Sequence, residues 1–300
     1  MRPYGRSRHR MSFKYYKVTQ AGIKVSEEDI SSEVYQELID AKSILANALN
    51  LEETLLIPVD NLIDFEKAVV CRIVDDLYIF DRNYPDYHAQ RMIFQRHLSN
   101  VILTTELFLD KGKGYYWRMF GQFINDEDKA ARKKEFDTLV SQAYDESAAF
   151  RVCNTLINYL KHNNLAVHGT SSGEQWDEKR EFMSHRLNAY ITKSELIENY
   201  ERFKAIDKKG WLSQLPEKME VLPLLKEYVS KLHGILCELR EKAKDHLDNA
   251  KEQVKLAHNG NDKNLVVVQK RQGDNVIEES TILLEWETVR QHLVDKFRTF

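Results

Sequence analysis

The sequence predicts a mainly α-helical protein of long helices with small β segments, and three observations carry that prediction. The 300 residues include only five prolines and eleven glycines, so few positions interrupt a helix. Apolar residues recur at spacings of three and four over most of the chain, which is the period of one helix face. The clearest such run extends from Pro223 to His258, about 36 residues, a length that favours a coiled-coil partner or an extended bundle.

The N-terminal segment, residues 1–25, is predicted to be a basic, disordered arm. Residues 1–26 contain seven lysines and arginines and no acid, whereas the whole chain has a net charge of −3. A basic arm on an acidic body is a candidate contact for nucleic acid. Met11 is a second candidate start, which leaves open whether residues 1–10 belong to the native chain.

Residues 26–164 are predicted to form a helical bundle. The capping-box-like stretch Ser26–Asp29 marks the first helix start, and Pro85 suits the first turn of a later helix. The glycines of Lys111–Gly114 are expected to end that later helix, and Tyr115–Phe120 is expected to form a short packed aromatic segment. The helices predicted here cover residues 26–50, 60–80, 85–109 and 126–162.

Three further segments complete the predicted order. Residues 165–192 are expected to form an extended β arm or hairpin, with a turn at Gly169–Gly173 and a strand at Glu181–Ile191. Residues 193–260 are expected to hold a helix over 193–203 and the long helix, capped by Gly260. Residues 261–300 are predicted to form a small C-terminal β-hairpin around Gly273, followed by a short helix to Phe297.

Several classes of function are excluded by motif and composition. No phosphate-binding GxxxxGK[ST] or GxGxxG loop occurs, and neither HExxH nor any ExxH pair occurs, so we expect no cofactor and no metal. The stretch Gly169–Gly173 matches G-x-S-x-G, but no strand–helix alternation precedes it to support a nucleophilic Ser171. The acids around His88 are interpreted as solvated surface: Asp75, Asp76, Asp81 and Asp86.

The predicted setting is the cytoplasm. No apolar run approaches the roughly 18 residues of a membrane span, and the N-terminus lacks the apolar core of a signal peptide. Three cysteines lie far apart without a CxxC grouping, and we interpret all three as small core residues in a reducing compartment: Cys71, Cys153 and Cys237.

One helix face carries the main candidate chemistry. Arg151, Asn154, Asn158 and His162 follow one another at spacings of three, four and four, so they share a face of the helix predicted there. A cation and two amides can hold a phosphate, and an imidazole that titrates near neutral pH can move a proton. These residue types suit metal-independent cleavage of RNA.

The stretch from Tyr159 to His168, Tyr-Leu-Lys-His-Asn-Asn-Leu-Ala-Val-His, follows a helix with Phe150-Arg151 and resembles the HEPN superfamily. The resemblance implies a dimer of antiparallel helical bundles. Many members are metal-independent ribonucleases of toxin, phage-defence or CRISPR systems, and others are inactive assembly modules. By this match Asn158 and His162 occupy the polar and histidine positions of the family motif, whereas Ile157 stands where the family has arginine.

Two functions follow from that departure. The first is a non-catalytic HEPN-like interaction or scaffold protein of a bacterial toxin or phage-defence system, which pairs with itself or with a partner protein through its long helices. The alternative is a ribonuclease acting on RNA, with His162 as general acid or base and Arg151, or an arginine of a partner chain, steadying the phosphate. Arg91 and His97 are a second candidate pair on another predicted helix.

Overall fold

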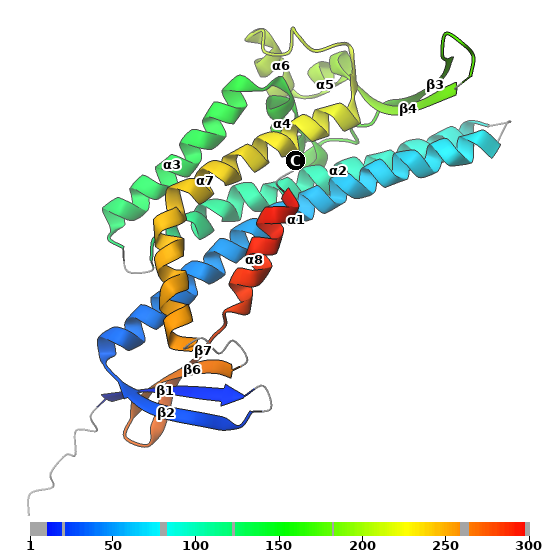
Figure 1. Ribbon diagram of the computed structural model, residues 1–300. Coiled ribbons are helices and arrows are strands. Elements are labelled where there is room, and N and C mark those ends of the chain that lie inside the picture. The colour runs from blue at the N-terminus through cyan, green and yellow to red at the C-terminus, as the bar shows by residue number, and fades with distance from the viewer. Residues whose placement is uncertain are drawn as a thin grey trace, which may run out of the picture. The chain divides into compact units, whose positions relative to one another are not determined.

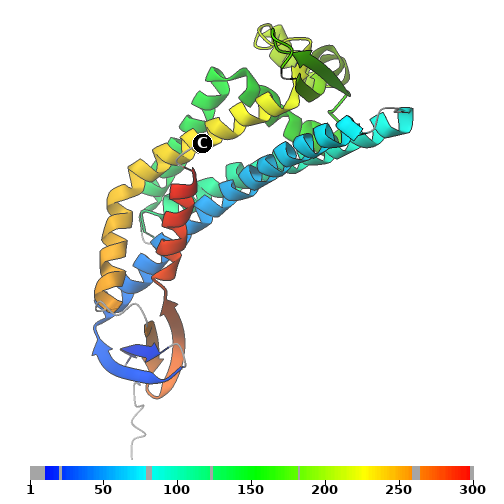
Figure 2. The ribbon, with the colours of Figure 1, turned by 45° about the vertical axis from the view of Figure 1, so that its right-hand side comes forward.

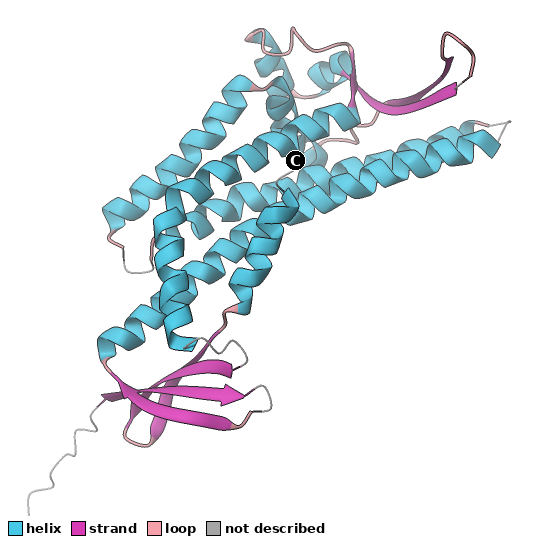
Figure 3. Cartoon of the chain, in the orientation of Figure 1, coloured by secondary structure: helices cyan, strands magenta, loops and turns pink. Residues whose placement is uncertain are grey.

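The chain is mainly helical and carries two small antiparallel sheets, as the sequence predicts at that level of detail (Figures 1 and 3). The computed structural model describes residues 11–19, 22–78, 83–121, 124–181, 183–258 and 264–297. The helices in it are α1 (Ser32–Tyr78), α2 (Tyr84–Arg118), α3 (Asp126–Glu146), α4 (Ala148–His162), α5 (Lys193–Asn199), α6 (Glu201–Lys208), α7 (Val221–His258) and α8 (Glu285–Lys296). The strands are β1 (Met11–Thr19), β2 (Lys24–Ile30), β3 (Gly169–Trp176), β4 (Met183–Thr192), β5 (Lys218–Glu220), β6 (Asn264–Gln272) and β7 (Asn275–Ile282).

The chain divides into two compact units. The first contains residues 1–52, 114–133 and 239–299, and the second contains residues 53–113 and 134–238. Within the described residues, no helix is both long enough and apolar enough to cross a bilayer.

The first unit contains a four-stranded sheet in the order β2-β1-β6-β7. The predicted C-terminal hairpin is confirmed as β6 and β7, and Gly273 takes a positive φ of 61° in the turn that joins them. β1 completes the sheet by pairing along its whole length with β6, and Tyr15 and Tyr16 are buried at 7% and 8% exposure. The predicted disordered arm is therefore wrong for residues 11–19 and for Lys24 and Val25, while residues 1–10 lie outside the described part.

The predicted helix start at Ser26 is also wrong. Residues 26–30 belong to β2, where Ser26 pairs with Lys17 and Ile30 with Phe13. The helix α1 begins six residues later, and the Ser31 hydroxyl accepts a hydrogen bond from the backbone N–H of Val34 at 3.2 Å. An N-cap of this kind satisfies one of the donors that a helix start leaves open.

Two predicted helix interruptions are absent. The break expected between residues 50 and 60 does not occur, because α1 runs through it with Pro58 inside the helix. The break expected at Lys111–Gly114 does not occur either, since α2 continues to Arg118. The aromatic segment Tyr115–Phe120 is packed as predicted at Tyr116 and Phe120, which are buried with their rings 5.3 Å apart.

Buried and half-buried charges join three helices of the first unit. Glu52 is 1% exposed and accepts hydrogen bonds from Arg240 Nε at 2.8 Å and Nη2 at 2.5 Å. Arg290 binds Glu287 through Nε at 2.7 Å and Nη2 at 2.9 Å, and Lys251 lies 2.9 Å from Glu287. Burial acts to raise the pKa of Glu287, but the hydrogen bond and charge of Arg290, with Lys251, outweigh it and hold that pKa below its usual value.

In the second unit, residues of α1 and α2 lie side by side, as Figures 1 and 2 both show. The rings of Phe65 and Phe94 are 5.7 Å apart, and the Asn61 amide donates to Thr104 Oγ1 at 3.2 Å. Asn83 and Asp86 cap the start of α2 reciprocally, each backbone N–H bonded to the other's side chain. Pro85 thus stands in the first turn of α2, as predicted, although residues 79–82 of the expected turn lie outside the described part.

The helix predicted over residues 126–162 is interrupted at Ser147. Ser147 has extended φ and ψ of −121° and 122°, and its hydroxyl accepts from the backbone N–H of Phe150 at 3.0 Å. The same hydroxyl donates to Glu227 Oε1 at 2.6 Å. Beyond this cap α4 buries Phe150 against Tyr228, with ring centroids 5.0 Å apart. The helix predicted over 193–203 is likewise interrupted, at the extended residue Tyr200.

The predicted β arm at 165–192 is confirmed as the β3–β4 hairpin, to which the short β5 adds a third strand. The turn expected at Gly169–Gly173 is wrong, because these residues pair with Tyr190–Arg186 as part of β3. Ser171 lies on this exposed strand. The long helix predicted at Pro223–His258 is confirmed as α7, while Gly260 lies outside the described residues.

Of the three cysteines, only Cys153 is buried. Cys71 and Cys237 are exposed, so the prediction of a core position is wrong for both.

Candidate functional site

The four residues of the predicted polar face lie on α4, but they do not act as one group. Arg151 is buried, and its Nη1 donates to the carbonyl oxygens of Tyr144 and Asp145, both at 2.8 Å. These carbonyls belong to the last turn of α3, whose C-terminal end attracts a cation. Ser147 ends α3 at this point, so the break that the sequence did not predict creates the acceptors that engage Arg151.

Asn154 and Asn158 do come together, as the helical spacing predicts. Both amides line a pocket of about 280 Å³ on the surface of the second unit. The opposite wall carries two exposed cations, Arg202 and Lys209, and the ring of Trp211. We call this site the Trp211 pocket, and its lining residues are Tyr144, Asn154, Thr155, Asn158, Arg202, Ala205, Ile206, Lys209 and Trp211.

Trp211 anchors the aromatic side of this pocket. The ammonium group of Lys209 lies 4.4 Å from the Trp211 ring centroid, and the guanidinium of Arg151 lies 5.2 Å from it. Tyr144 meets the same ring edge-on at 5.8 Å. Cation–π contacts of this kind hold the ring in place and keep positive charge beside it. Arg151 therefore helps to hold the Trp211 ring in place, although it is not among the lining residues of the pocket.

His162 stands apart from the pocket. It is the last residue of α4, is exposed, and is not among the residues that line the Trp211 pocket. Its neighbours are engaged elsewhere: Lys161 pairs with Glu106, and the Asn163 amide donates to the Asn199 carbonyl oxygen at 2.9 Å. The structure thus unites the two amides with new cations and leaves the predicted acid–base residue outside.

The second candidate pair, Arg91 and His97, is not brought together in one pocket. Arg91 Nη1 donates to the Val167 carbonyl oxygen at 3.1 Å. The His97 ring stacks on Phe65 with centroids 5.8 Å apart. Burial, with the charge of Arg96 adding to it, lowers the pKa of His97. His97 is therefore a packed, neutral histidine beside the core rather than a proton carrier for Arg91.

The cations of the Trp211 pocket were missed in the sequence. Arg202 and Lys209 are seven residues apart, which is two turns of a helix, and Trp211 follows Lys209 by two residues. Basic residues at that spacing beside a tryptophan are a recognisable signal. What the sequence does not show is that this segment packs against α4, about 50 residues earlier.

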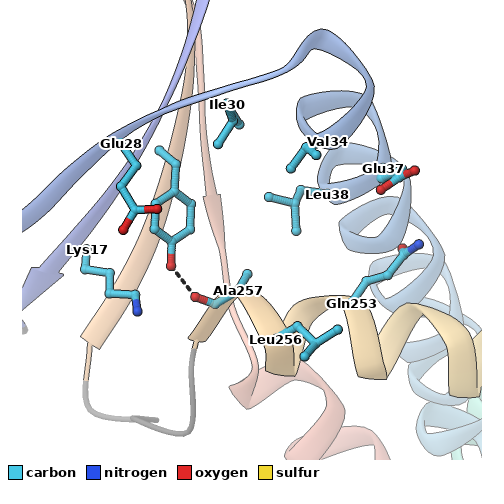
Figure 4. A pocket seen from close by; sticks show the side chains of 10 residues that line it. Lys17, Glu28, Ile30, Val34, Glu37, Leu38, Gln253, Leu256 and Ala257 are labelled. Atoms are coloured by element: carbon cyan, nitrogen blue, oxygen red, sulfur yellow. Dashed lines mark hydrogen bonds between the residues drawn. The ribbon is translucent and has the colours of Figure 1, made fainter.

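A different pocket lies in the first unit, where the sheet meets helix ends (Figure 4). It has a volume of about 370 Å³ and mixes apolar side chains such as Ile30, Val34 and Leu38 with Lys17 and the acids Glu28 and Glu37. The Tyr15 hydroxyl donates to the Ala257 carbonyl oxygen at its base. Burial raises the pKa of Tyr15 to about 12, with Glu28 adding to the effect. This arrangement fixes the sheet to the end of α7 and offers no acid–base pair.

Within the residues that the structure describes, no three His, Cys, Asp or Glu side chains are grouped to hold a metal ion. The chemistry available at the Trp211 pocket is that of two cations, two amides and aromatic rings, a set suited to an anionic, aromatic ligand. Comparison of the chain with protein-family models, with curated proteins and with solved structures finds no match.

Proposed function

We propose that this chain is a non-catalytic helical interaction protein that binds single-stranded RNA at the Trp211 pocket. The proposal rests on one observation: the asparagines of the polar face of α4 line a pocket, and the histidine of the same face does not. Asn154 and Asn158 line a pocket with Arg202 and Lys209, while His162 lies outside it. The lining can hold a phosphate but contains no imidazole to move a proton.

The charges of the pocket support a phosphate ligand. Arg202 and Lys209 are both exposed in the free protein, so a phosphate can reach them directly. Neither cation bears the cost of full burial before the ligand binds. The amide groups of Asn154 and Asn158 supply neutral N–H donors on the opposite wall. Since the chain as a whole has a net charge of −3, binding depends on this local grouping rather than on a basic surface.

The aromatic rings support a nucleic-acid ligand over a free anion. Trp211 and Tyr144 lie at the same pocket and meet edge-on. Bases of single-stranded RNA stack on such rings with little dependence on sequence, and the backbone phosphates pair with neighbouring cations. The pocket volume of about 280 Å³ lies just below the roughly 300–1,000 Å³ typical of small-molecule sites, so the pocket suits one base of a strand rather than a duplex.

The cellular setting we propose is the one that the HEPN resemblance implies. The chain would serve as an inactive HEPN-like assembly module of a bacterial toxin or phage-defence system. The 38-residue helix α7 buries its apolar stripe from Leu225 to Val254 inside the chain, so pairing with a second copy or with a partner protein would use its exposed outer face. Sedimentation analysis of the purified protein tests this part separately: a dimer supports self-pairing, and a monomer at all concentrations contradicts it.

RNA binding is tested by fluorescence anisotropy with a labelled twelve-nucleotide single-stranded RNA. Lys209→Gln and Arg202→Gln are each expected to weaken binding and to lower the salt dependence by about 0.7 in log–log slope, since each removes one phosphate contact. Lys208→Gln is the matched control, because Lys208 is exposed, belongs to α6 and does not line the pocket. Equal effects of all three variants, or no binding by the wild-type protein, would refute the proposal.

A second candidate is a metal-independent ribonuclease with His162 as its general acid or base. Its support is the exposure of His162, which leaves the imidazole accessible to an arginine from a partner chain. Incubating the protein with RNA in the presence of a chelator separates the two functions. We expect intact RNA. Cleavage that disappears in His162→Ala would establish the ribonuclease instead.

A further inference from the structure

A second polar pocket in the same unit shares no residue with the Trp211 pocket. It lies where the first two turns of α2 meet the β3–β4 hairpin and has a volume of about 440 Å³. That size is within the range of roughly 300–1,000 Å³ typical of small-molecule sites. We call it the Arg91 pocket, and its lining residues are Tyr84, Tyr87, His88, Arg91, His168, Gly169, Thr170 and Tyr190.

Arg91 is the cation at the centre of this lining. It is half-buried, and its Nη1 donates to the Val167 carbonyl oxygen at 3.1 Å, which fixes the guanidinium. No other hydrogen bond of Arg91 occurs among the described residues, so most of its five N–H donors remain for a ligand. His88 precedes it by three positions on α2 and therefore lies on the same side of the helix. Arg91 and His88 can therefore both donate hydrogen bonds to an anion bound beside this face of α2.

His168 contributes its ring to the lining of the pocket. Its Nδ1 accepts a hydrogen bond from the backbone N–H of Thr192 at 2.8 Å, so in the neutral ring the proton resides on Nε2. Burial lowers the pKa of His168, and Arg91 adds to this, although Glu195 at 3.6 Å from Nε2 opposes it. The Nε2 N–H of the neutral ring lies beside the Glu195 carboxylate, so the side-chain donors available to a phosphate in this pocket are those of Arg91 and His88.

Tyrosine rings form the rest of the wall, and one of them depends on a glycine. The Tyr190 hydroxyl lies so close to Gly169 that a methyl group added to that glycine would collide with it. The ammonium of Lys218 lies 4.6 Å from the Tyr190 ring centroid, which adds positive charge nearby. Tyr84 and Tyr87 are 81% and 49% exposed, and such uncovered rings offer faces on which a base can stack.

We propose that the Arg91 pocket binds a nucleoside monophosphate, free or as the 5′-phosphorylated end of an RNA, with the phosphate held by Arg91 and His88 and the base against Tyr84 or Tyr87. The lining supplies both halves of that recognition, since the Arg91 guanidinium selects the phosphate and the tyrosines select the aromatic base. The Asp86 side chain caps the start of α2, so the helix terminus itself is already occupied and the side chains carry the binding.

The test is calorimetric titration of the full chain with AMP, adenosine and inorganic phosphate in parallel. AMP is expected to bind, and adenosine and phosphate are each expected to bind at least about tenfold more weakly, because each lacks one half of the ligand. Phosphate alone binding as tightly as AMP would overturn the nucleotide assignment. Absence of AMP binding would overturn the site itself.

Variants locate the site. Arg91→Gln is expected to weaken AMP binding by about tenfold or more, and Arg91→Lys by less, because lysine keeps the charge without the fork of donors. Arg96→Gln removes an exposed cation from the same helix outside the pocket and should change nothing. An equal loss in Arg96→Gln, or none in a folded Arg91→Gln protein, would contradict the proposal.

A further pair of measurements separates this site from the Trp211 pocket. Lys209→Gln should leave the part of AMP binding that Arg91→Gln removes unchanged, and Arg91→Gln should leave binding of a 5′-hydroxyl RNA unchanged. The free nucleotide and the RNA end are distinguished by comparing AMP with an eight-nucleotide RNA that carries a 5′-phosphate. AMP binding that is lost in Lys209→Gln but kept in Arg91→Gln would mean that AMP binds at the Trp211 pocket, and it would overturn the inference.

Discussion

Glu52 accepts two hydrogen bonds from Arg240 across 188 residues of sequence, at 2.8 Å to Nε and 2.5 Å to Nη2. The carboxylate is 2% exposed, and Arg290 Nη1 lies 3.7 Å from it as a second cation. Planar two-point contacts between arginine and a carboxylate are among the stronger polar contacts in proteins. This pair ties α1 to α7 inside the first unit.

We predict that Glu52→Gln lowers the free energy of unfolding by about 3–5 kcal/mol, because it removes the buried carboxylate that the half-buried Arg240 guanidinium binds at two points, while Arg290 keeps Glu287 as its acid. Urea denaturation followed by circular dichroism measures this change. Glu53→Gln is the control, since Glu53 is the adjacent residue and is exposed. Similar losses in both variants would mean that the Glu52–Arg240 contact is not the source.

Tyr15→Phe should lower the free energy of unfolding by about 1 kcal/mol, because it leaves the part-buried carbonyl oxygen of Ala257 without its donor. Tyr78→Phe, at a position 78% exposed, should have no measurable effect. The folded state raises the pKa of Tyr15 to about 12, above its usual value of 10. Neutral Tyr15 thus contributes stability below pH 10 that is lost as the pH rises toward 12, and Tyr15→Phe should lack that alkaline loss.

The predicted pH dependence near neutrality comes from His168. Its pKa is lower in the folded state than the usual 6.5, so the unfolded chain binds a proton more readily. The corresponding stability is present above pH 6.5 and is lost as the pH falls through the folded pKa. In His168→Asn, where the amide oxygen can still accept from Thr192, urea midpoints between pH 8 and 5 should fall less than in the wild type. Parallel curves would show that His168 does not contribute.

Ser147→Ala should destabilise the second unit by about 0.5–2 kcal/mol, through loss of the N-cap to Phe150 and of the hydrogen bond to Glu227. The matched change Ser141→Ala, at an exposed position inside α3, should be neutral or slightly stabilising. Thermal unfolding of the two variants provides the comparison. A loss in Ser141→Ala of the same size would contradict the assignment of the effect to the cap.

Local sequence patterns predicted those elements whose partners are close in the chain. Periodicity over many turns located α7, and the glycine of the Gly273 turn located the β6–β7 hairpin. The N-terminal strands were missed because β1 pairs with β6, about 250 residues away. The residues Ser26–Asp29 match a helix-capping pattern locally, but they form a strand because they pair with β1 in the sheet. The alternation of Phe13, Tyr15 and their polar neighbours in β1 was the available clue.

The candidate site shows the same division. Helical spacing placed Asn154 and Asn158 on one face correctly, because that relationship is contained within one helix. The partners that give this face its character, Lys209 and Trp211, come from a later segment and could not be deduced from spacing. The role of Arg151 depended on where α3 ends, and residues 126–162 carry one continuous apolar stripe that conceals the break.

The burial of Cys153 has a practical consequence for following how this protein opens. Its thiol is fully enclosed and burial raises its pKa well above the ordinary value, so neither access nor the reactive thiolate is available in the native state. Cys71 and Cys237 face solvent. An alkylating reagent should therefore modify two sites rapidly, and the third only when α4 separates from its neighbours. Mass spectrometry over time then measures the rate of that opening as the rate at which the third alkyl group is added, without a dye or an engineered label.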